Sequence, residues 1–372
     1  MHHNQPVLPH NLFRVLLLLA LATGLWVSGC AQPAATPTPT PSQASPTSLP
    51  LPTATLTTAA SPLDVPTPAP SATPTVAPTP TATTESSPLP TPAILDDLSF
   101  DGGLAYEFVL AQCDLGPRPT GSEAGWATGD YLIGQLERMG WQVVVHEFTF
   151  LDVPGRNIIG KKGSGPVAML GAHYDTRPYA DHNPEGQREQ WILGANDGGS
   201  GVAVLLELAR ILEVEKTGHE IWLAFFDAED RGNLDGWPFS VGAGWLAQDI
   251  AQHTRPELSP APEFVIVVDM VGDAGQELHY EGFSEPALNA RIWSLAHDLG
   301  YGAIFVPDVK HRLIDDHRPF IDVGIPAIDI IDFDYPFWHT TEDTADKVEP
   351  ASLERVGRVL ELFLETGATW RE

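Results

Sequence analysis

The sequence of 372 residues has few cysteines and few basic side chains. Two cysteines exclude a disulfide-stabilised scaffold and a cysteine-rich zinc module. Twenty Lys and Arg stand against 49 Asp and Glu, which gives a net charge of −29. Binding to a phosphate backbone needs clustered cations, so nucleic acid is excluded as a partner.

The N-terminus lacks an apolar run long enough to cross a membrane. Residues 15–29 are apolar or small and follow Arg14, whereas a transmembrane helix needs about 20 such residues. The run is typical of a signal peptide. It ends in Val27-Ser28-Gly29-Cys30, which resembles a bacterial lipobox. We expect residues 1–30 to be a lipoprotein signal peptide with lipid attached to Cys30. The alternative is an ordinary secretory signal with an incidental cysteine.

Proline is concentrated in one segment, since 17 of the 35 prolines lie in residues 31–92. Thr-Pro and Ala-Pro repeats with two charged residues, Asp64 and Glu85, cannot bury a core, so residues 31–93 are predicted to be a disordered linker. In a polyproline II conformation this linker would extend beyond roughly 100 Å. We expect an exported cell-envelope lipoprotein, anchored in the membrane through its lipid. Its catalytic domain, residues 94–372, would lie outside the cytoplasmic membrane.

The remaining sequence alternates helical and strand patterns. Helices are expected at 104–113, 122–139, 200–212, 288–299 and 351–366, and strands at 143–150, 157–160, 167–174, 221–226, 264–271 and 326–331. Several of the expected strands are almost continuously apolar. Such strands, alternating with helices, indicate an α/β fold with a mostly parallel sheet that is covered on both faces.

Acidic residues and histidines are concentrated at the expected carboxyl ends of these strands, where ligands bind in such sheets. The five clusters are His173-Tyr174-Asp175, Asn196-Asp197, Asp227-Ala228-Glu229-Asp230, Asp269-Met270-Val271-Gly272-Asp273 and Trp338-His339-Thr340-Thr341-Glu342-Asp343. One such cluster alone would be read as a turn or a solvated helix start. Together they offer nitrogen and oxygen ligands that suit zinc, and no cysteine is available for a closed structural site. The sequence therefore predicts an open, catalytic metal site.

The spacing within the clusters suggests roles for individual residues. His173 and Asp175 are two residues apart on extended chain, so Asp175 could hold the second imidazole nitrogen of His173. Glycines around Asp197 allow tight turns that bring its carboxylate close to a metal. The side chains of Glu229 and Asp230 diverge, so one can bind metal while the other carries a proton.

At the motif Leu115-Gly116-Pro117-Arg118-Pro119-Thr120-Gly121-Ser122 and at these clusters, the chain resembles metallopeptidase family 28, which contains zinc aminopeptidases and glutaminyl cyclases. The resemblance covers essentially Leu104 to the C-terminus. The resemblance implies a single three-layer α/β/α domain with a twisted, mostly parallel mixed sheet. It makes Asp197, Asp230 and His339 zinc ligands and Glu229 the general acid/base. In the aminopeptidases, positions matching His173 and Asp269 complete a second metal site that Asp197 bridges. The family usually has Glu where this chain has Asp230.

Two further segments resemble the cyclase branch. Ile314-Asp315-Asp316-His317-Arg318-Pro319-Phe320 is similar to an acidic segment whose second Asp hydrogen-bonds the acid equivalent to Asp269. This makes Asp316 and Asp269 catalytic candidates. Trp338 and, more loosely, Trp237 match the substrate pocket, with core packing as the alternative for both. The insertion at 181–190 is expected to be a lid or a rim loop.

The resemblance leaves two reactions open. A glutaminyl-peptide cyclotransferase would convert the N-terminal Gln of peptides or proteins to pyroglutamate with one zinc ion. An aminopeptidase would hydrolyse N-terminal residues with two zinc ions. A non-catalytic envelope binding module is a third alternative, although every catalytic position holds a competent residue. We favour the cyclase and expect a monomer.

Overall fold

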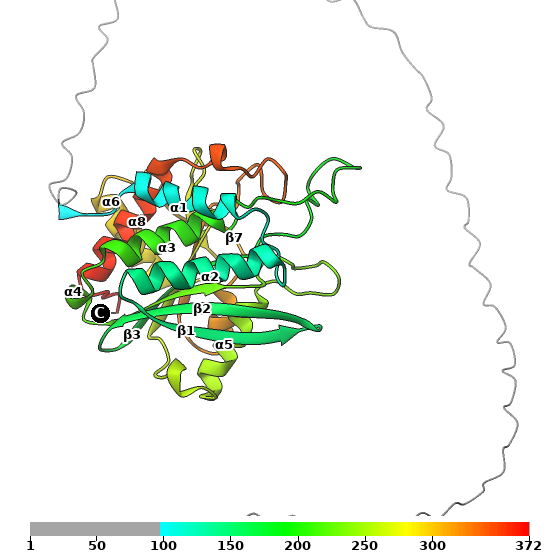
Figure 1. Cartoon of the computed structure of the whole chain (residues 1–372). Helices are drawn as coiled ribbons and strands as arrows, with labels where there is room; N and C mark the ends of the chain where they lie inside the picture. The colour runs from blue at the N-terminus through cyan, green and yellow to red at the C-terminus, as the bar shows by residue number, and fades with distance from the viewer. Residues whose placement is uncertain (1–96, 372) are drawn as a thin grey trace, which may run out of the picture. The chain divides into compact units, whose positions relative to one another are not determined.

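The computed structural model describes residues 97–371 (Figure 1). The expected signal peptide with Cys30, and the linker over residues 31–93, lie outside the described residues. Among the helices of the described part, none is both long enough and apolar enough to cross a bilayer.

The central sheet has six strands, and those that carry the candidate site are parallel. Its strands are β1 Gln142–Phe150, β2 Val153–Gly163, β3 Val167–His173, β4 Glu220–Phe226, β5 Phe264–Asp269 and β8 Ala327–Ile331, in the order β1-β2-β4-β3-β5-β8. β4, β3, β5 and β8 run parallel, while β1 and β2 form an antiparallel edge. Every residue of β3, β5 and β8 is buried, as expected for strands covered on both faces.

Helices cover both faces of the sheet, so the predicted three-layer α/β/α fold is confirmed (Figure 1). One layer contains α1 Gly102–Asp114, α2 Glu123–Arg138, α3 Gly199–Ile211, α6 Pro286–Asp298 and α8 Pro350–Glu365. The other contains α5 Val241–Gln252 and α7 Arg318–Asp322. Because α3 packs against β3, α1 and α8, nearly all of its residues are buried, which explains why its sequence is apolar on all sides.

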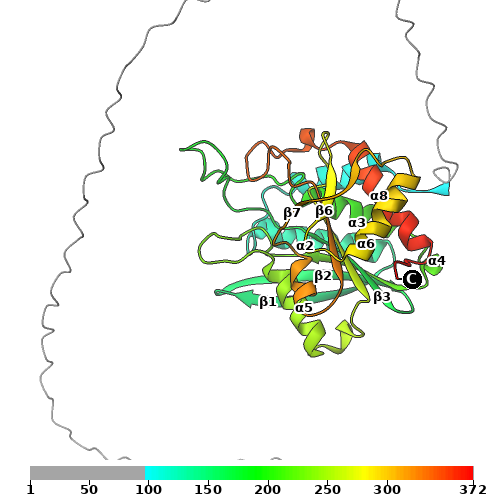
Figure 2. The same ribbon diagram turned by 180° about the vertical axis from the view of Figure 1, so that it is seen from behind.

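Every expected helix and strand is present, but the structure contains further elements. These are α4 Val214–Thr217, α5, α7 and a separate parallel pair, β6 Leu278–Glu281 and β7 Phe305–His311, visible in Figure 2. Glycines at 242 and 244 weaken the helical signal of α5. Gly242 is needed there, since a Cβ atom would lie 2.0 Å from the carbonyl oxygen of Asp227.

The parallel strands deliver their polar residues to one edge of the sheet. His173 ends β3 and Asp269 ends β5. The chain turns sharply just beyond β4 and β5, where Ala228 and Met270 have positive φ angles of 63° and 46°, and again at His339 in the loop after β8, with a φ angle of 58°. Side chains other than glycine rarely adopt this conformation, and it is concentrated at functional sites.

Candidate active site

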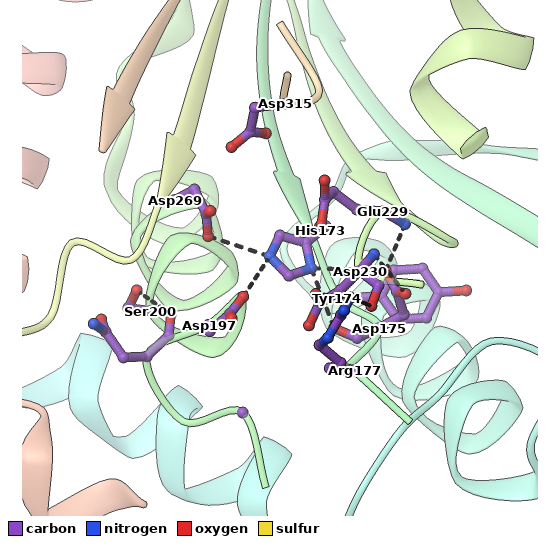
Figure 3. A network of polar contacts seen from close by, with 12 residues as sticks. His173, Tyr174, Asp175, Arg177, Asp197, Ser200, Glu229, Asp230, Asp269 and Asp315 are labelled. Carbon is purple, nitrogen blue, oxygen red and sulfur yellow. Dashed lines mark hydrogen bonds and ion pairs between the residues drawn. The ribbon is translucent and has the colours of Figure 1, made fainter. Parts of the chain in front are cut away.

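Five of the predicted ligands form two groups that share Asp197. Asp197, Asp230 and His339 form one group, and His173, Asp197 and Asp269 form the other; within each group the potential ligand atoms lie within 4.8 Å of one another. His173 Nε2 is 3.2 Å from Asp197 Oδ1 and 3.2 Å from Asp269 Oδ1 (Figure 3). His339 Nε2 is 3.0 Å from Asp230 Oδ1. All five residues are buried.

The chemistry of this set fits a divalent cation. Burial and the neighbouring Asp197 raise the pKa of Asp230 to about 6, and burial is also the main reason why the pKa of Asp269 rises to about 7. Burial alone would lower the pKa of His173, but Asp269, Asp175 and Asp197 outweigh it and raise that pKa well above its usual value. Carboxylates crowded around two imidazoles are stabilised by a positive charge between them, and this mixture of N and O donors suits zinc.

Asp175 has a different contact from the one expected. The carbonyl oxygen of Asp175 lies 3.1 Å from His173 Nδ1, whereas its carboxylate is 3.6 Å away. The carboxylate instead accepts hydrogen bonds from the backbone N–H groups of Glu229, at 3.0 Å, and Asp230, at 3.2 Å. Asp175 therefore orients the turn that carries both side chains, while its own backbone faces the imidazole.

Asp343 holds the backbone of Asp197 in the way that Asp175 holds the backbone of Glu229 and Asp230. Its carboxylate accepts the N–H groups of Asn196 and Asp197, at 2.9 and 3.2 Å, and the hydroxyl of Tyr335 at 2.8 Å. Burial and the nearby Asp197 raise the pKa of Asp343 to about 7. The sequence placed Asp343 in the last polar cluster but gave no sign that it anchors the backbone of a ligand in another cluster.

Arg118 connects two loops of the site through hydrogen bonds to their backbones. Its wholly buried guanidinium donates hydrogen bonds to three carbonyl oxygens, those of Tyr174 at 3.0 Å, Leu193 at 2.7 Å and Gly194 at 2.9 Å. These loops carry His173 and Asp197. Arg118 belongs to the Leu115–Ser122 motif, but nothing in the sequence shows that its side chain turns inward.

The insertion at 181–190 contacts the candidate metal-binding residue His339 and does not line the cavity. Arg177 holds Asp181 in a bidentate ion pair, with nitrogen–oxygen distances of 2.8 and 2.7 Å. Asp181 Oδ1 in turn lies 3.3 Å from His339 Nδ1. The backbone N–H of His182 donates to the carbonyl oxygen of His339. Residues 184–190 are exposed, and none of the insertion lines the cavity, so it is a rim loop and not a lid.

The ligands open onto a cavity of about 370 Å³. Its polar wall contains Asp197, Glu229, Asp230, Asp269, Asp315 and His339, and its apolar wall includes Phe239, Met270, Leu313, Ile331, Phe333 and Trp338. Glu229 accepts a hydrogen bond from Ser240 Oγ at 3.2 Å. Burial, and next to it the charge of Asp315, raise the pKa of Glu229 well above its usual value. This shift favours the protonated form of Glu229, as a group that passes on a proton needs.

The prediction for the acidic segment is off by one residue. Asp315 lines the cavity and faces the cluster of His173, Asp269 and Glu229 in Figure 3. Asp316 is wholly buried outside the lining, and its carboxylate makes no hydrogen bond within the described part of the chain. Adjacent residues at a turn point in different directions, and sequence alone does not separate two consecutive aspartates.

Of the two tryptophans, Trp338 lines the cavity, with its ring centroid 3.9 Å from that of His339. For Trp237 the structure shows the alternative, core packing, and not a place in the pocket. It is 4% exposed and packs in a small apolar cluster, with an edge contact of 4.8 Å to Phe150. Phe239, two residues further on, supplies the aromatic wall instead.

Comparison with known proteins matches the model of peptidase family M28 to residues 157–364, which include all five candidate ligands. A glutaminyl-peptide cyclotransferase-like protein of Mus musculus is 24% identical over 279 residues, 66% of this chain and 71% of that protein. A Bacteroides thetaiotaomicron glutaminyl cyclase structure has a TM-score of 0.66 at 32% identity, covering 72% of this chain and 98% of the other. A Zn-dependent exopeptidase of Parabacteroides distasonis has a TM-score of 0.66 at 31% identity, covering 72% and 99%.

Proposed function

The chain is a metalloenzyme that belongs to peptidase family M28, and from this premise we propose that it is a glutaminyl-peptide cyclotransferase. Its substrate would be a peptide or protein that begins with Gln, and its products a pyroglutamyl N-terminus and ammonia. The observation that carries the proposal is Asp315, which adds a carboxylate to the cavity wall beyond Glu229 and the proposed metal ligands. The exopeptidase relative and the family imply zinc, while the number of ions belongs to the proposal.

In this proposal Asp197, Asp230 and His339 would hold one zinc ion. When bound there, zinc would act as a Lewis acid toward the γ-carbonyl oxygen of the substrate glutamine. His173 would orient Asp197 and Asp269 through its Nε2 contacts of 3.2 Å to both carboxylates. Asp175 and Asp343 would fix the backbone beneath Glu229 and Asp197.

Glu229 would carry the proton of the reaction. It would accept a proton from the substrate's α-amine as the nitrogen forms a bond to the γ-carbonyl carbon. It would then give that proton to the side-chain amide nitrogen as the carbon–nitrogen bond breaks and ammonia leaves. Both transfers need a carboxyl group whose pKa lies near the working pH, and burial with Asp315 shifts the pKa of Glu229 in that direction.

Asp269 and Asp315 would position the departing amide. Burial, helped by Asp315, raises the pKa of Asp269 to about 7 against the opposing effect of His173. The oxygens of both carboxyl groups can accept hydrogen bonds from an amide NH₂ group. Trp338, Phe239 and Phe333 would enclose the apolar part of the glutamine side chain.

A two-zinc aminopeptidase is the second candidate, because Asp197 belongs to both groups of ligands. His173 and Asp269 would then hold a second ion. Glu229 would take a proton from the attacking water and pass it to the departing amine. The cavity is closed by the same walls in either case, so the two candidates differ in the bond that is broken and in the substrate's first side chain.

Ammonia release tests the proposed reaction. The zinc-loaded full-length protein is incubated with a Gln-initiated peptide, and ammonia is measured by a coupled enzymatic assay. Ammonia should appear in proportion to the peptide consumed, and Glu229→Gln should release none. Consumption of the peptide with free glutamine as a product would instead support the aminopeptidase.

We also propose, from the sequence alone, that the protein is exported and anchored through lipid on Cys30. Cys30→Ser should then shift the protein from the membrane fraction to the soluble fraction. An unchanged distribution would leave Cys30 without this role.

A further inference from the structure

A second hollow adjoins the catalytic cavity. It has a volume of about 500 Å³ and lies between α5, α7 and the end of β1. α5 and α7 pack against each other in the helical layer on the opposite side of the sheet from α2 and α3. Three residues, Pro238, Phe239 and Ile314, line both the hollow and the cavity. We call this hollow the α5–α7 groove, and these shared residues separate it from the adjacent catalytic cavity.

One face of α5 forms the long side of the groove. Val241, Gly244, Trp245 and Gln248 line it and follow the i, i+3, i+4, i+7 spacing of a single helix face. Trp245 is 41% exposed, and Ile314 on the ridge beside the cavity is 67% exposed. Large apolar side chains left open to water in one hollow mark a binding surface.

The charges at the groove favour a neutral occupant. Arg318 and Asp322 line its opposite side, and they pair with each other at 2.8 Å between Nε and Oδ1. The remaining lining is apolar apart from Ser240 and the side-chain amide of Gln248. The groove therefore offers apolar contact and a few hydrogen-bonding groups without an unpaired charge.

We propose that the α5–α7 groove binds the residues of a peptide substrate beyond its first two, and that it prefers apolar or aromatic side chains there. This rests on the proposed function, in which the substrate is a peptide N-terminus, and it applies to either reaction. A cavity of about 370 Å³ lies near the lower end of the range for small-ligand sites, roughly 300–1,000 Å³, so it has room for the first two residues of a peptide and not for a longer segment. The rest of the peptide must extend out of the cavity past one of its walls. Phe239 and Ile314 form the wall that the cavity shares with the groove, so a peptide that passes them enters the groove.

Two variants change the groove in opposite ways. Trp245→Ala removes its largest exposed aromatic side chain. Gly244→Leu fills it, because a Cβ atom at Gly244 would meet nothing within 4 Å. Replacing a glycine by leucine inside a helix also favours the helix, so this variant should fold. Trp191→Ala is the matched control, since Trp191 is 59% exposed and lies outside both the groove and the cavity.

Calorimetry on the zinc-loaded full-length protein carrying Glu229→Gln avoids consumption of the peptides. The dissociation constants of two amidated peptides, Gln-Ala and Gln-Ala-Phe-Leu, are compared. Burial of the two added apolar side chains should make the longer peptide bind about tenfold more tightly. Trp245→Ala and Gly244→Leu should each remove most of this advantage, and Trp191→Ala should retain it.

Equal affinities for the two peptides, absence of binding by the longer one, or an advantage that survives both groove variants would overturn the proposal. Turnover by the unmodified protein is measured separately. Peptide binding that depends on the groove, without ammonia release, would show that the reaction is wrong and the groove right. Ammonia release that does not depend on peptide length would show that the proposed reaction is right and the proposed role of the groove is wrong.

Discussion

Replacing Asp181 by asparagine should weaken zinc binding although Asp181 is not one of the proposed ligands. Asp181 Oδ1 lies 3.3 Å from His339 Nδ1, so its carboxylate stabilises the imidazole orientation in which Nε2 faces the metal site. The substitution keeps the size of the side chain and removes its charge. It also leaves Arg177, which is 3% exposed, without its bidentate partner, so that its remaining ion pair is the one with the proposed ligand Asp230, at 3.7 Å. The loss of the contact with His339 and the loss of the ion pair with Arg177 should both weaken zinc binding.

The structure limits the size of this effect. Loss of a group that orients a metal-binding histidine typically costs about 10–100-fold in affinity. The side chain of Asp181 is 32% exposed, so water screens part of its charge. We therefore expect an increase of about tenfold in the zinc dissociation constant, or about 1.4 kcal/mol.

A chromophoric chelator that competes for zinc at fixed pH measures this constant directly. The control is Asp235→Asn, because Asp235 is an exposed aspartate that pairs with Arg231 at 3.0 Å and lies outside the cavity. The control should bind zinc as the unmodified protein does. An Asp181→Asn protein with unchanged zinc affinity would refute the reasoning, and so would an equal loss in the control.

Three further predictions concern single residues. Glu229→Gln should abolish turnover and leave the zinc content, measured by plasma mass spectrometry, unchanged; residual turnover would remove Glu229 from the proton transfer. Asp315→Asn should lower kcat by about 100-fold. Asp316→Asn should lower kcat only a few-fold, because burial and Asp315 already raise the pKa of Asp316 and favour its neutral form. Equal losses of kcat in the two variants would contradict the assignment of Asp315 to the cavity. Burial opposes ionisation of Glu281, but His317, at 2.9 Å, and backbone N–H groups outweigh it and lower the pKa of Glu281 from 4.5 to about 2. A lowered carboxyl pKa stabilises the fold above pH 4.5 and is lost as the pH falls toward 2, so Glu281→Gln should cost about 3 kcal/mol at pH 7 and less in acid. Urea unfolding at several pH values tests this, and a cost that does not depend on pH would count against the ion pair.

The parallel strands and the clustering of the candidate metal-binding residues could be predicted from the sequence for the same physical reason. Strands buried on both faces have continuous apolar runs, and their carboxyl ends share one edge of the sheet. The polar residues just beyond 173, 226 and 269 are therefore neighbours in any such fold. Other elements have no such signal: α5 contains Gly242 and Gly244, β6 has only four residues, and β7 contains a proline and is largely exposed.

The direction of individual side chains could not be predicted. Asp315 and Asp316 are adjacent and identical, and only the turn into α7 decides which one lines the cavity. Trp237 and Phe239 lie on the same loop, but one packs inward and the other faces the cavity. Asp181 belongs to a polar stretch that looks like a solvated loop, and its contact with His339 depends on tertiary structure.

The central claim is that the enzyme closes a ring on an N-terminal glutamine. The most direct measurement is a single reaction in which the zinc-loaded full-length protein meets equal amounts of a Gln-initiated and a Leu-initiated peptide, followed by mass spectrometry. The account predicts that the Gln peptide loses one ammonia while the Leu peptide stays intact. Shortening of the Leu peptide by one residue, with no loss of ammonia from the Gln peptide, would contradict it and support the two-zinc aminopeptidase.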